Sequence, residues 1–223
     1  MKHAALATQE RRQANLVASC AAVAFLASGV TARRGLVGRI EQQCFHVFNG
    51  LPAGAFAPVW VVMQLGSLGG VVVSAGAARA VRHRPLAVRL ATRGTCAWVL
   101  AKLIKPVFRR GRPEATLDRW RVLGREQAGL GFPSGHTAVV TTLALITARE
   151  VPCRWRPSLW VLAAGVSASR MYVGAHLPLD VIGGAAIGVG IGSRGPDRGQ
   201  RGPSRSQAGR RPPRRRLVRR ATA

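Results

Sequence analysis

Three short segments of the 223-residue chain combine cations, histidines and a carboxylate at spacings suited to chemistry on a phosphate group. Residues 105–113 read K-x6-R-P, residues 133–136 read P-S-G-H, and residues 169–180 read S-R-x5-H-x3-D. The candidate site residues in them are Lys105, Arg112, Ser134, Gly135, His136, Arg170, His176 and Asp180. Each segment lies at the end of an apolar run, so the three can converge at one face of a helical bundle.

The cations in these segments predict an anion pocket. A charged side chain in or beside an apolar segment is costly unless it is paired, so such residues indicate a functional site. Lys105, Arg112 and Arg170 have only Asp180 as a predicted acid nearby. An anion with several oxygens, such as phosphate, would satisfy the surplus positive charge.

The P-S-G-H segment opens a predicted helix. Ser134 can cap this helix, and Gly135 lets a ligand approach the N-terminal N–H groups, which bind anions. The sequence has no carboxylate cluster that would hold a divalent metal ion, so we expect metal-independent chemistry without a cofactor.

The two histidines have distinct possible roles. His176 and Asp180 are four residues apart, and Pro178 between them favours a helix start. Asp180 can then accept a hydrogen bond from one ring nitrogen of His176 and leave the other free to attack. His136 can protonate the leaving oxygen as a general acid.

The three segments together resemble the signature of the type 2 phosphatidic acid phosphatase (PAP2) superfamily, which also includes bacterial acid phosphatases and vanadium haloperoxidases. All three patterns are met without substitution, and the resemblance covers about residues 40–192. It implies an all-helical core and a phosphohistidine intermediate. By motif position it implies His176 as the nucleophile, Asp180 as its orienting partner and His136 as the leaving-group acid. The residues it implies for phosphate binding are Lys105, Arg112, Ser134, Gly135 and Arg170.

Apolar runs supply the elements that would position these residues. The runs cover residues 16–30, 55–78, 86–107, 137–148, 159–173 and 177–192. They predict an all-α fold, a polytopic membrane bundle of about six transmembrane helices around a PAP2-like catalytic core. The uncharged run 55–78 is the strongest prediction of a single membrane helix. Residues 35–54 have helical spacing and look interfacial, and the glycine-rich stretches 66–70 and 183–192 predict close helix packing.

Three parts of the chain are expected. Residues 1–39 would be an N-terminal segment with the first transmembrane helix, residues 40–192 the phosphatase core, and residues 193–223 a disordered Arg-rich tail. The first apolar run fits either a retained membrane helix or the core of a cleaved signal peptide.

Charge and apolarity together limit the class of protein. The chain has 34 Lys and Arg against 8 Asp and Glu, a formal net charge of +26, yet 48% of its residues are hydrophobic. This combination argues against a disordered basic protein and against a soluble basic domain. It fits an integral membrane protein with charged connections.

The distribution of Lys and Arg predicts an orientation. With the N-terminus in the cytoplasm, the basic connections 79–85 and 149–156 and the basic tail also face the cytoplasm. The basic loop 108–132 then faces outward, which headgroup binding would explain. We expect a bacterial plasma-membrane protein with an extracytoplasmic active site and a cytoplasmic tail. Arg109 and Arg110 are interpreted as loop charges, with contact to a lipid headgroup as the alternative.

The resemblance implies hydrolysis of a lipid phosphate or diphosphate, such as phosphatidic acid, phosphatidylglycerol phosphate or a polyprenyl diphosphate. A lipid phosphotransferase of the same superfamily is an open alternative, because no motif marks the acceptor. The apolar runs argue against a soluble haloperoxidase. The tail, with 11 Arg and one Asp in residues 194–223, also allows a polyanion-binding membrane protein. No nucleic-acid motif is present, so we expect membrane lipids as partners rather than a specific nucleic acid. The sequence gives no indication of the oligomeric state.

Overall fold

The computed structural model describes residues 2–35 and 37–194, and every regular element in this part of the chain is a helix. The predicted all-α fold class is therefore confirmed for these residues. The α-helices are α1 (Lys2–Arg33), α2 (Arg39–Asn49), α3 (Phe56–Met63), α4 (Leu68–Ala80), α5 (Arg84–Phe108), α6 (Pro113–Thr116), α7 (Gly135–Ala148), α8 (Arg156–Tyr172) and α9 (Pro178–Gly192). Short 3-10 helices are η1 (Ala53–Ala55), η2 (Gln64–Gly66) and η3 (Cys153–Trp155). The predicted disordered tail lies outside the described residues from position 195 onward.

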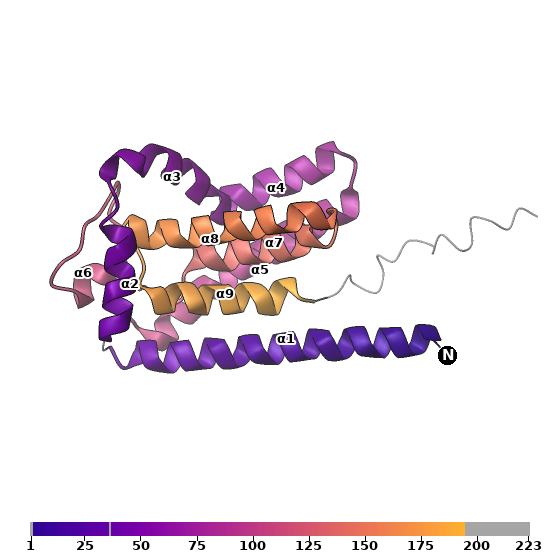
Figure 1. Ribbon diagram of the computed structural model, residues 1–223, viewed down its shortest axis with the longest axis horizontal. Helices are drawn as coiled ribbons and strands as arrows, with labels where there is room; N and C mark the ends of the chain where they lie inside the picture. The colour runs from indigo at the N-terminus through magenta and orange to yellow at the C-terminus, as the bar shows by residue number, and fades with distance from the viewer. Residues whose placement is uncertain (1, 36, 195–223) are drawn as a thin grey trace, which may run out of the picture.

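Helix α7 forms the centre of the bundle (Figure 1). Nearly all of its residues from Thr137 to Ala148 are buried, and it packs against α9, α5 and α8. A helix that is apolar and buried all round is expected in the core of a large bundle or of a membrane protein. This packing fixes the position of its first turn, which carries Gly135 and His136.

The two ends of the bundle differ in what they contain (Figure 1). At one end α2 lies across the bundle near α6, and the connection from α5 to α7 covers the same end. The N-terminus of α1, the α4–α5 and α7–α8 connections and the last turn of α9 lie at the other end. The basic connections 79–85 and 149–156 thus share one end, opposite the basic loop 108–132, as the charge-based topology predicts.

The apolar run 55–78 is not one continuous helix, contrary to the expectation from hydropathy. The chain breaks at η2, and the Oγ of Ser67 then caps α4 by accepting the N–H of Gly70 at 3.2 Å. A Cβ atom on Gly66 would lie only 2.7 Å from the carbonyl oxygen of His136. The break therefore brings the backbone against the first turn of α7, a tertiary contact that hydropathy does not detect.

Helix lengths test the predicted membrane topology only in part. In the described part of the chain, one helix is long and apolar enough to cross a membrane, namely Arg12–Arg33 within α1. The pair Arg39–Asn49 and Ala53–Gly66, bent by 72°, adds a second if it forms one broken span. Helices α4, α7 and α9 are apolar but shorter. These lengths do not establish six spanning helices, and that number stays a prediction.

Glycines on α9 allow it to pack closely on α7. A Cβ atom on Gly184 would collide with the carbonyl oxygen of Ser134, and one on Gly188 would lie 2.7 Å from the carbonyl oxygen of Ala138. The predicted role of the stretch 183–192 in close helix packing is therefore confirmed. This contact holds the starts of the two helices next to each other.

One face of α2 fixes it across the end of the bundle. Its buried residues Glu41, Phe45 and Asn49 are spaced by four positions. The Asn49 side-chain amide donates to the carbonyl oxygens of Arg121 at 2.8 Å and Tyr172 at 3.1 Å. Its Oδ1 accepts the backbone N–H of Arg121 at 2.8 Å. One amide thereby connects α2, the α6–α7 loop and the end of α8.

Candidate active site

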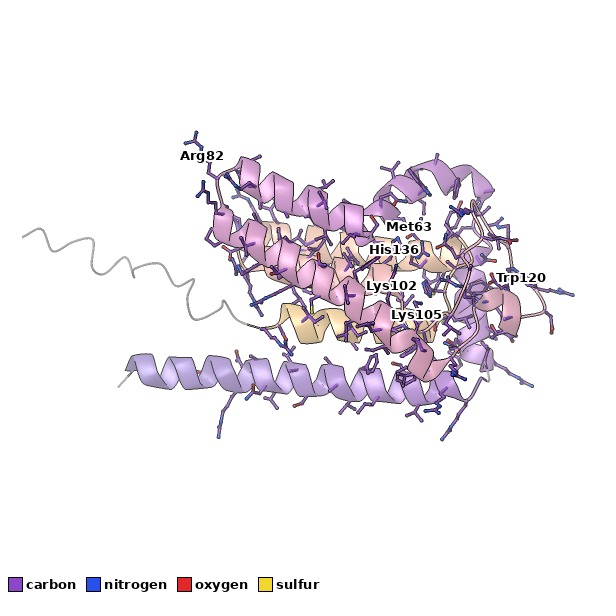
Figure 2. The ribbon with its side chains drawn as sticks, turned by 180° about the vertical axis from the view of Figure 1, so that it is seen from behind. Met63, Arg82, Lys102, Lys105, Trp120 and His136 are labelled. Atoms are coloured by element: carbon purple, nitrogen blue, oxygen red, sulfur yellow. The ribbon has the colours of Figure 1, made fainter. Side chains whose placement is uncertain are left out.

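The predicted site residues all lie at the end of the bundle where α5 and α8 stop and α7 and α9 begin. Lys105 is in the last turn of α5, Arg112 precedes α6, Ser134, Gly135 and His136 open α7, Arg170 is in the last turn of α8, and His176 and Asp180 flank the start of α9. Figure 2 shows Met63, His136 and Lys105 gathered inside the bundle, on the side of Trp120, with Arg82 at the opposite end. The structure thus brings three segments distant in sequence to one place.

His176 and Asp180 form a buried pair. Their side chains lie 3.3 Å apart, from Nδ1 of His176 to Oδ2 of Asp180. Oδ2 also accepts the backbone N–H of Leu177 at 3.0 Å. His176 is 3% exposed and Asp180 is fully buried. This contact occupies Nδ1 and leaves Nε2 of the imidazole as the nitrogen available for a substrate.

Lys105 and Arg112 are held by backbone carbonyls. Nζ of Lys105 donates to the carbonyl oxygens of Leu130 at 2.7 Å and Gly131 at 2.8 Å. Nε of Arg112 donates to that of Gly129 at 3.0 Å, and one terminal nitrogen donates to that of Ala175 at 2.8 Å. These partners are neutral, so they orient the two cations without neutralising their charge.

Arg170 is the most buried of the three predicted cations, at 2% exposure. One terminal nitrogen contacts Sδ of Met63 at 2.9 Å, and Nε is buried with no hydrogen-bond partner among the described residues. Within residues 2–35 and 37–194, no carboxylate forms a salt bridge with Arg170, Lys105 or Arg112. A buried guanidinium with an unsatisfied donor is costly, and a bound anion would satisfy it.

The start of α7 has the cap that the sequence predicts. Oγ of Ser134 accepts the backbone N–H of Thr137 at 3.5 Å and its hydroxyl at 3.1 Å. A Cβ atom on Gly135 would meet only Ala101, at 3.9 Å, so the surrounding protein leaves space at this residue. That space lies at a helix N-terminus, the part of a helix that binds anions through its free N–H groups.

Arg110 and Glu41 are site residues that the sequence interpretation missed. Contrary to its interpretation as a loop charge, Arg110 is 2% exposed and donates to Oδ1 of Asp180 at 3.0 Å and to Oε2 of Glu41 at 2.7 Å. Glu41 is thus a second acid beside the site, where the sequence predicted Asp180 alone. Burial lowers the pKa of Arg110, but the hydrogen bond to Glu41 and the charge of Asp180 outweigh this and raise the pKa above its usual value.

A signal for this pair was present in the sequence. Arg110 lies inside the first motif, and Glu41 shares a four-residue spacing with Phe45 on the face of α2 that proves to be buried. An acid on the apolar face of a helix requires a cation, and this requirement predicts a buried partner. The spacing alone does not say which of the many arginines it is.

The family model of the PAP2 superfamily matches residues 67–194, more than half of the chain. The chain belongs to the PAP2 superfamily. The family resemblance that the three motifs predicted is therefore confirmed.

Curated relatives of this PAP2 chain include an undecaprenyl-diphosphatase from Sulfolobus acidocaldarius, 34% identical over 111 residues, which are 48% of this chain and 52% of the relative. A lipid A 4'-phosphatase from Porphyromonas gingivalis is 34% identical over 102 residues, 44% of this chain and 43% of the relative. The chain thus spans about half the length of the curated relatives it matches.

Solved structures extend the likeness over more of the PAP2 chain. LpxE from Aquifex aeolicus has a TM-score of 0.58 and 25% identity, over 70% of this chain and 93% of that one. A transmembrane PAP2-type phosphatidylglycerolphosphate phosphatase from Bacillus subtilis has a TM-score of 0.57 and 19% identity, over 76% and 91% of the two chains. The second match shows a shared fold.

The surroundings of His176 in this PAP2 site favour the neutral form of its imidazole. Burial lowers the pKa of His176 well below its usual range, and the charges of Arg170, Lys105 and Arg112 lower it further, while the Gly131 carbonyl acts in the opposite direction. A neutral imidazole retains the lone pair that a nucleophile needs. The same cations that would bind an anion therefore also favour the neutral form of this histidine.

This effect predicts how the pH profile responds to a lost cation. In Arg112→Gln, one positive charge near His176 is removed, so the pKa of His176 rises toward its ordinary value. We expect the acid limb of the pH profile of kcat/KM to lie at higher pH in the variant than in the wild type. Both proteins are assayed on the same phosphate ester, so ionisation of the substrate affects both profiles equally. Arg125→Gln, which changes an exposed loop arginine, is the control and leaves the limb in place. A limb that stays in place or moves to lower pH in Arg112→Gln would contradict this electrostatic account.

Proposed function

We propose that this chain is a membrane phosphatase that hydrolyses a lipid phosphate or diphosphate without a metal ion, through a phosphohistidine. The observation that carries the proposal is the buried His176–Asp180 pair beside three cations that form no salt bridge with any carboxylate in the described part of the chain. The positive charge of such a site would bind a phosphate group next to the proposed nucleophile. The names of the curated relatives support the choice of lipid phosphates and polyprenyl diphosphates as substrates.

The reaction proceeds in two steps. Nε2 of His176 attacks phosphorus, the bond between phosphorus and the leaving oxygen breaks, and His136 gives its proton to that oxygen. Water, deprotonated by His136, then attacks the phosphohistidine and releases inorganic phosphate. Asp180 stabilises the positive charge that develops on the His176 ring in each step. The cations and the free N–H groups at the start of α7 stabilise the negative charge on the phosphate oxygens.

Lys105, Arg112 and Arg170 are the phosphate-binding cations in this proposal, and Ser134 and Gly135 contribute the helix N-terminus. Burial makes each of these interactions stronger than it would be in water. Within the described residues, no group of three or more His, Cys, Asp and Glu side chains is arranged to hold a metal ion. The cations take the part that a divalent metal ion has in other phosphatases.

The proposed topology has six membrane crossings, formed by α1, the broken α3–α4 segment, α5, α7, α8 and α9. Large apolar side chains such as Val72, Leu103 and Val161 are exposed on the outside of the bundle, as contact with lipid requires. The basic connections at the end opposite the site would face the cytoplasm, so the site would face outward.

Phosphate release in the presence of EDTA tests the proposal. We expect the purified protein in detergent to release inorganic phosphate from phosphatidic acid, phosphatidylglycerol phosphate or a polyprenyl diphosphate. The rate is expected to stay within about twofold when EDTA is added, since three protein cations replace the metal ion. A known metal-dependent phosphatase assayed in parallel confirms that the chelator is effective. Loss of activity with EDTA that returns with added Mg²⁺ would contradict metal independence, and no release from any of these substrates would contradict the proposed function.

A further inference from the structure

A chain of charged side chains continues from the catalytic pair to helix α2. Arg110 bridges two carboxylates, with one terminal nitrogen 3.0 Å from Oδ1 of Asp180 and the other 2.7 Å from Oε2 of Glu41. The second oxygen of Glu41, Oε1, accepts the backbone N–H of Leu179 at 2.9 Å. Glu41 is 8% exposed, and the other two charged residues are more deeply buried. The bridge lies behind Asp180, separate from the three cations proposed to bind phosphate.

The contacts of Asp180 show what the bridge does to this carboxylate. Arg110 holds Oδ1, so the carboxylate cannot rotate without breaking a buried ion pair. Oδ2 is thereby directed at Nδ1 of His176 and at the N–H of Leu177. The orientation of the nucleophile thus depends on Arg110 through Asp180.

Glu41 fixes both partners of this arrangement. Its Oε2 holds the guanidinium of Arg110 in the orientation that also contacts Asp180. Its Oε1 accepts the N–H of Leu179 in the first turn of α9, the turn that carries Asp180. The backbone of Arg110 contributes as well, since its carbonyl oxygen accepts the N–H of Gly131 at 2.8 Å. A Cβ atom on Gly131 would lie 2.9 Å from Oδ2 of Asp180, so the loop and the carboxylate are in direct contact.

We infer that Arg110 and Glu41 are positioning residues for the catalytic pair and that α2 acts on the reaction through them. This inference rests on the proposed function, because it assigns the two residues to the hydrolysis step. The guanidinium fork matches two carboxylates at once, which a lysine ammonium cannot do with the same geometry. The ion pairs spanning 69 and 70 residues of sequence therefore orient His176 for attack.

Charge-conserving variants separate positioning from net charge. In Arg110→Lys we expect kcat for phosphatidic acid to fall about 10- to 100-fold, as for other side chains that orient a catalytic ligand, with KM changed less than about threefold. Arg109→Lys makes the same change at the neighbouring exposed residue and is expected to keep the wild-type kcat. The elution volume in detergent and the thermal unfolding midpoint report whether each variant is folded.

A double-mutant cycle tests whether Glu41 acts through Asp180. Glu41→Gln keeps an oxygen for the Leu179 N–H but loses the charge, and we expect kcat to fall about fivefold or more. In an Asp180→Asn background, the same Glu41→Gln change is expected to have less than a twofold effect, because the group it positions is already altered. Glu126→Gln, at an exposed loop acid, is the matched control and has no effect in either background.

Orthovanadate, a phosphate analogue that requires no turnover, makes the test independent of the substrate. We expect its Kd, measured by calorimetry, to rise about five- to tenfold in Arg110→Lys and to stay unchanged in Arg109→Lys. If the wild type binds orthovanadate but hydrolyses no lipid phosphate, the proposed function fails while this comparison still decides the positioning role. Folded Arg110→Lys protein with wild-type kcat and orthovanadate affinity would overturn the inference. An equal effect of Glu41→Gln in both backgrounds would also overturn it.

Discussion

Replacement of His176 by alanine is expected to reduce phosphate release by about 10⁴-fold or more, because removal of a nucleophile eliminates the covalent route. His176 is the histidine paired with Asp180 through Nδ1, and its Nε2 is the nitrogen proposed to attack phosphorus. The other described histidine beside an acid, His83 with Glu150 at 3.4 Å, is partly exposed and lies in the α4–α5 connection, away from the predicted site residues. The residual rate would come from the cations alone, which can still bind and polarise the phosphate. The measurement is kcat of the purified variant on the best lipid phosphate of the panel.

His46→Ala is the control for this change, since His46 is an exposed histidine on α2 and has no part in the proposed site. It is expected to retain wild-type kcat. A second readout follows the intermediate itself: wild-type protein quenched in alkali after mixing with ³²P-labelled substrate should carry label, and His176→Ala should carry none. Activity of His176→Ala close to that of the wild type would show that another group attacks phosphorus.

The chemistry of the site was readable from the sequence because its residue types occur at fixed local spacings. His176 and Asp180 are one helical turn apart, so a single N-terminal turn is enough to bring them into contact. The cap at Ser134 could also be predicted from the sequence, because the capping side chain and the N–H that it accepts are only three residues apart. The position of the three segments at one end of the bundle followed from the alternation of apolar runs and connections, since successive helices return the chain to the same end.

The parts that the sequence did not predict depend on contacts between distant residues. The bridge of Glu41, Arg110 and Asp180 joins positions about 70 residues apart, and no local pattern selects Arg110 over Arg109. The break at Gly66 is another example, because an apolar run with no charge hides a turn that is packed against His136. Hydropathy reports how apolar a segment is, whereas the direction of its backbone is set by what it packs against.

Replacement of His136 by alanine is expected to have the second large effect, and its size should depend on the leaving group. A general acid contributes about 10²- to 10⁴-fold when the leaving oxygen must be protonated. With phosphatidic acid, whose leaving group is a poor alkoxide, we expect a loss of about 10³-fold in kcat. With p-nitrophenyl phosphate, whose phenolate leaves without a proton, the first step is expected to be slowed by less than about tenfold.

The two steps of the reaction make this prediction more specific. His136 is also the proposed base for the attack of water, so its loss slows breakdown of the phosphohistidine even when the leaving group is good. Rapid mixing of His136→Ala with p-nitrophenyl phosphate should therefore give a burst of p-nitrophenol equal to the enzyme concentration, followed by slow turnover. The double variant with His176→Ala should give no burst, because the acceptor nitrogen is absent. An equal loss on both substrates with no burst would mean that His136 binds the phosphate rather than transferring a proton. The contact between His136 and Gly66 would then serve to hold a binding residue in place.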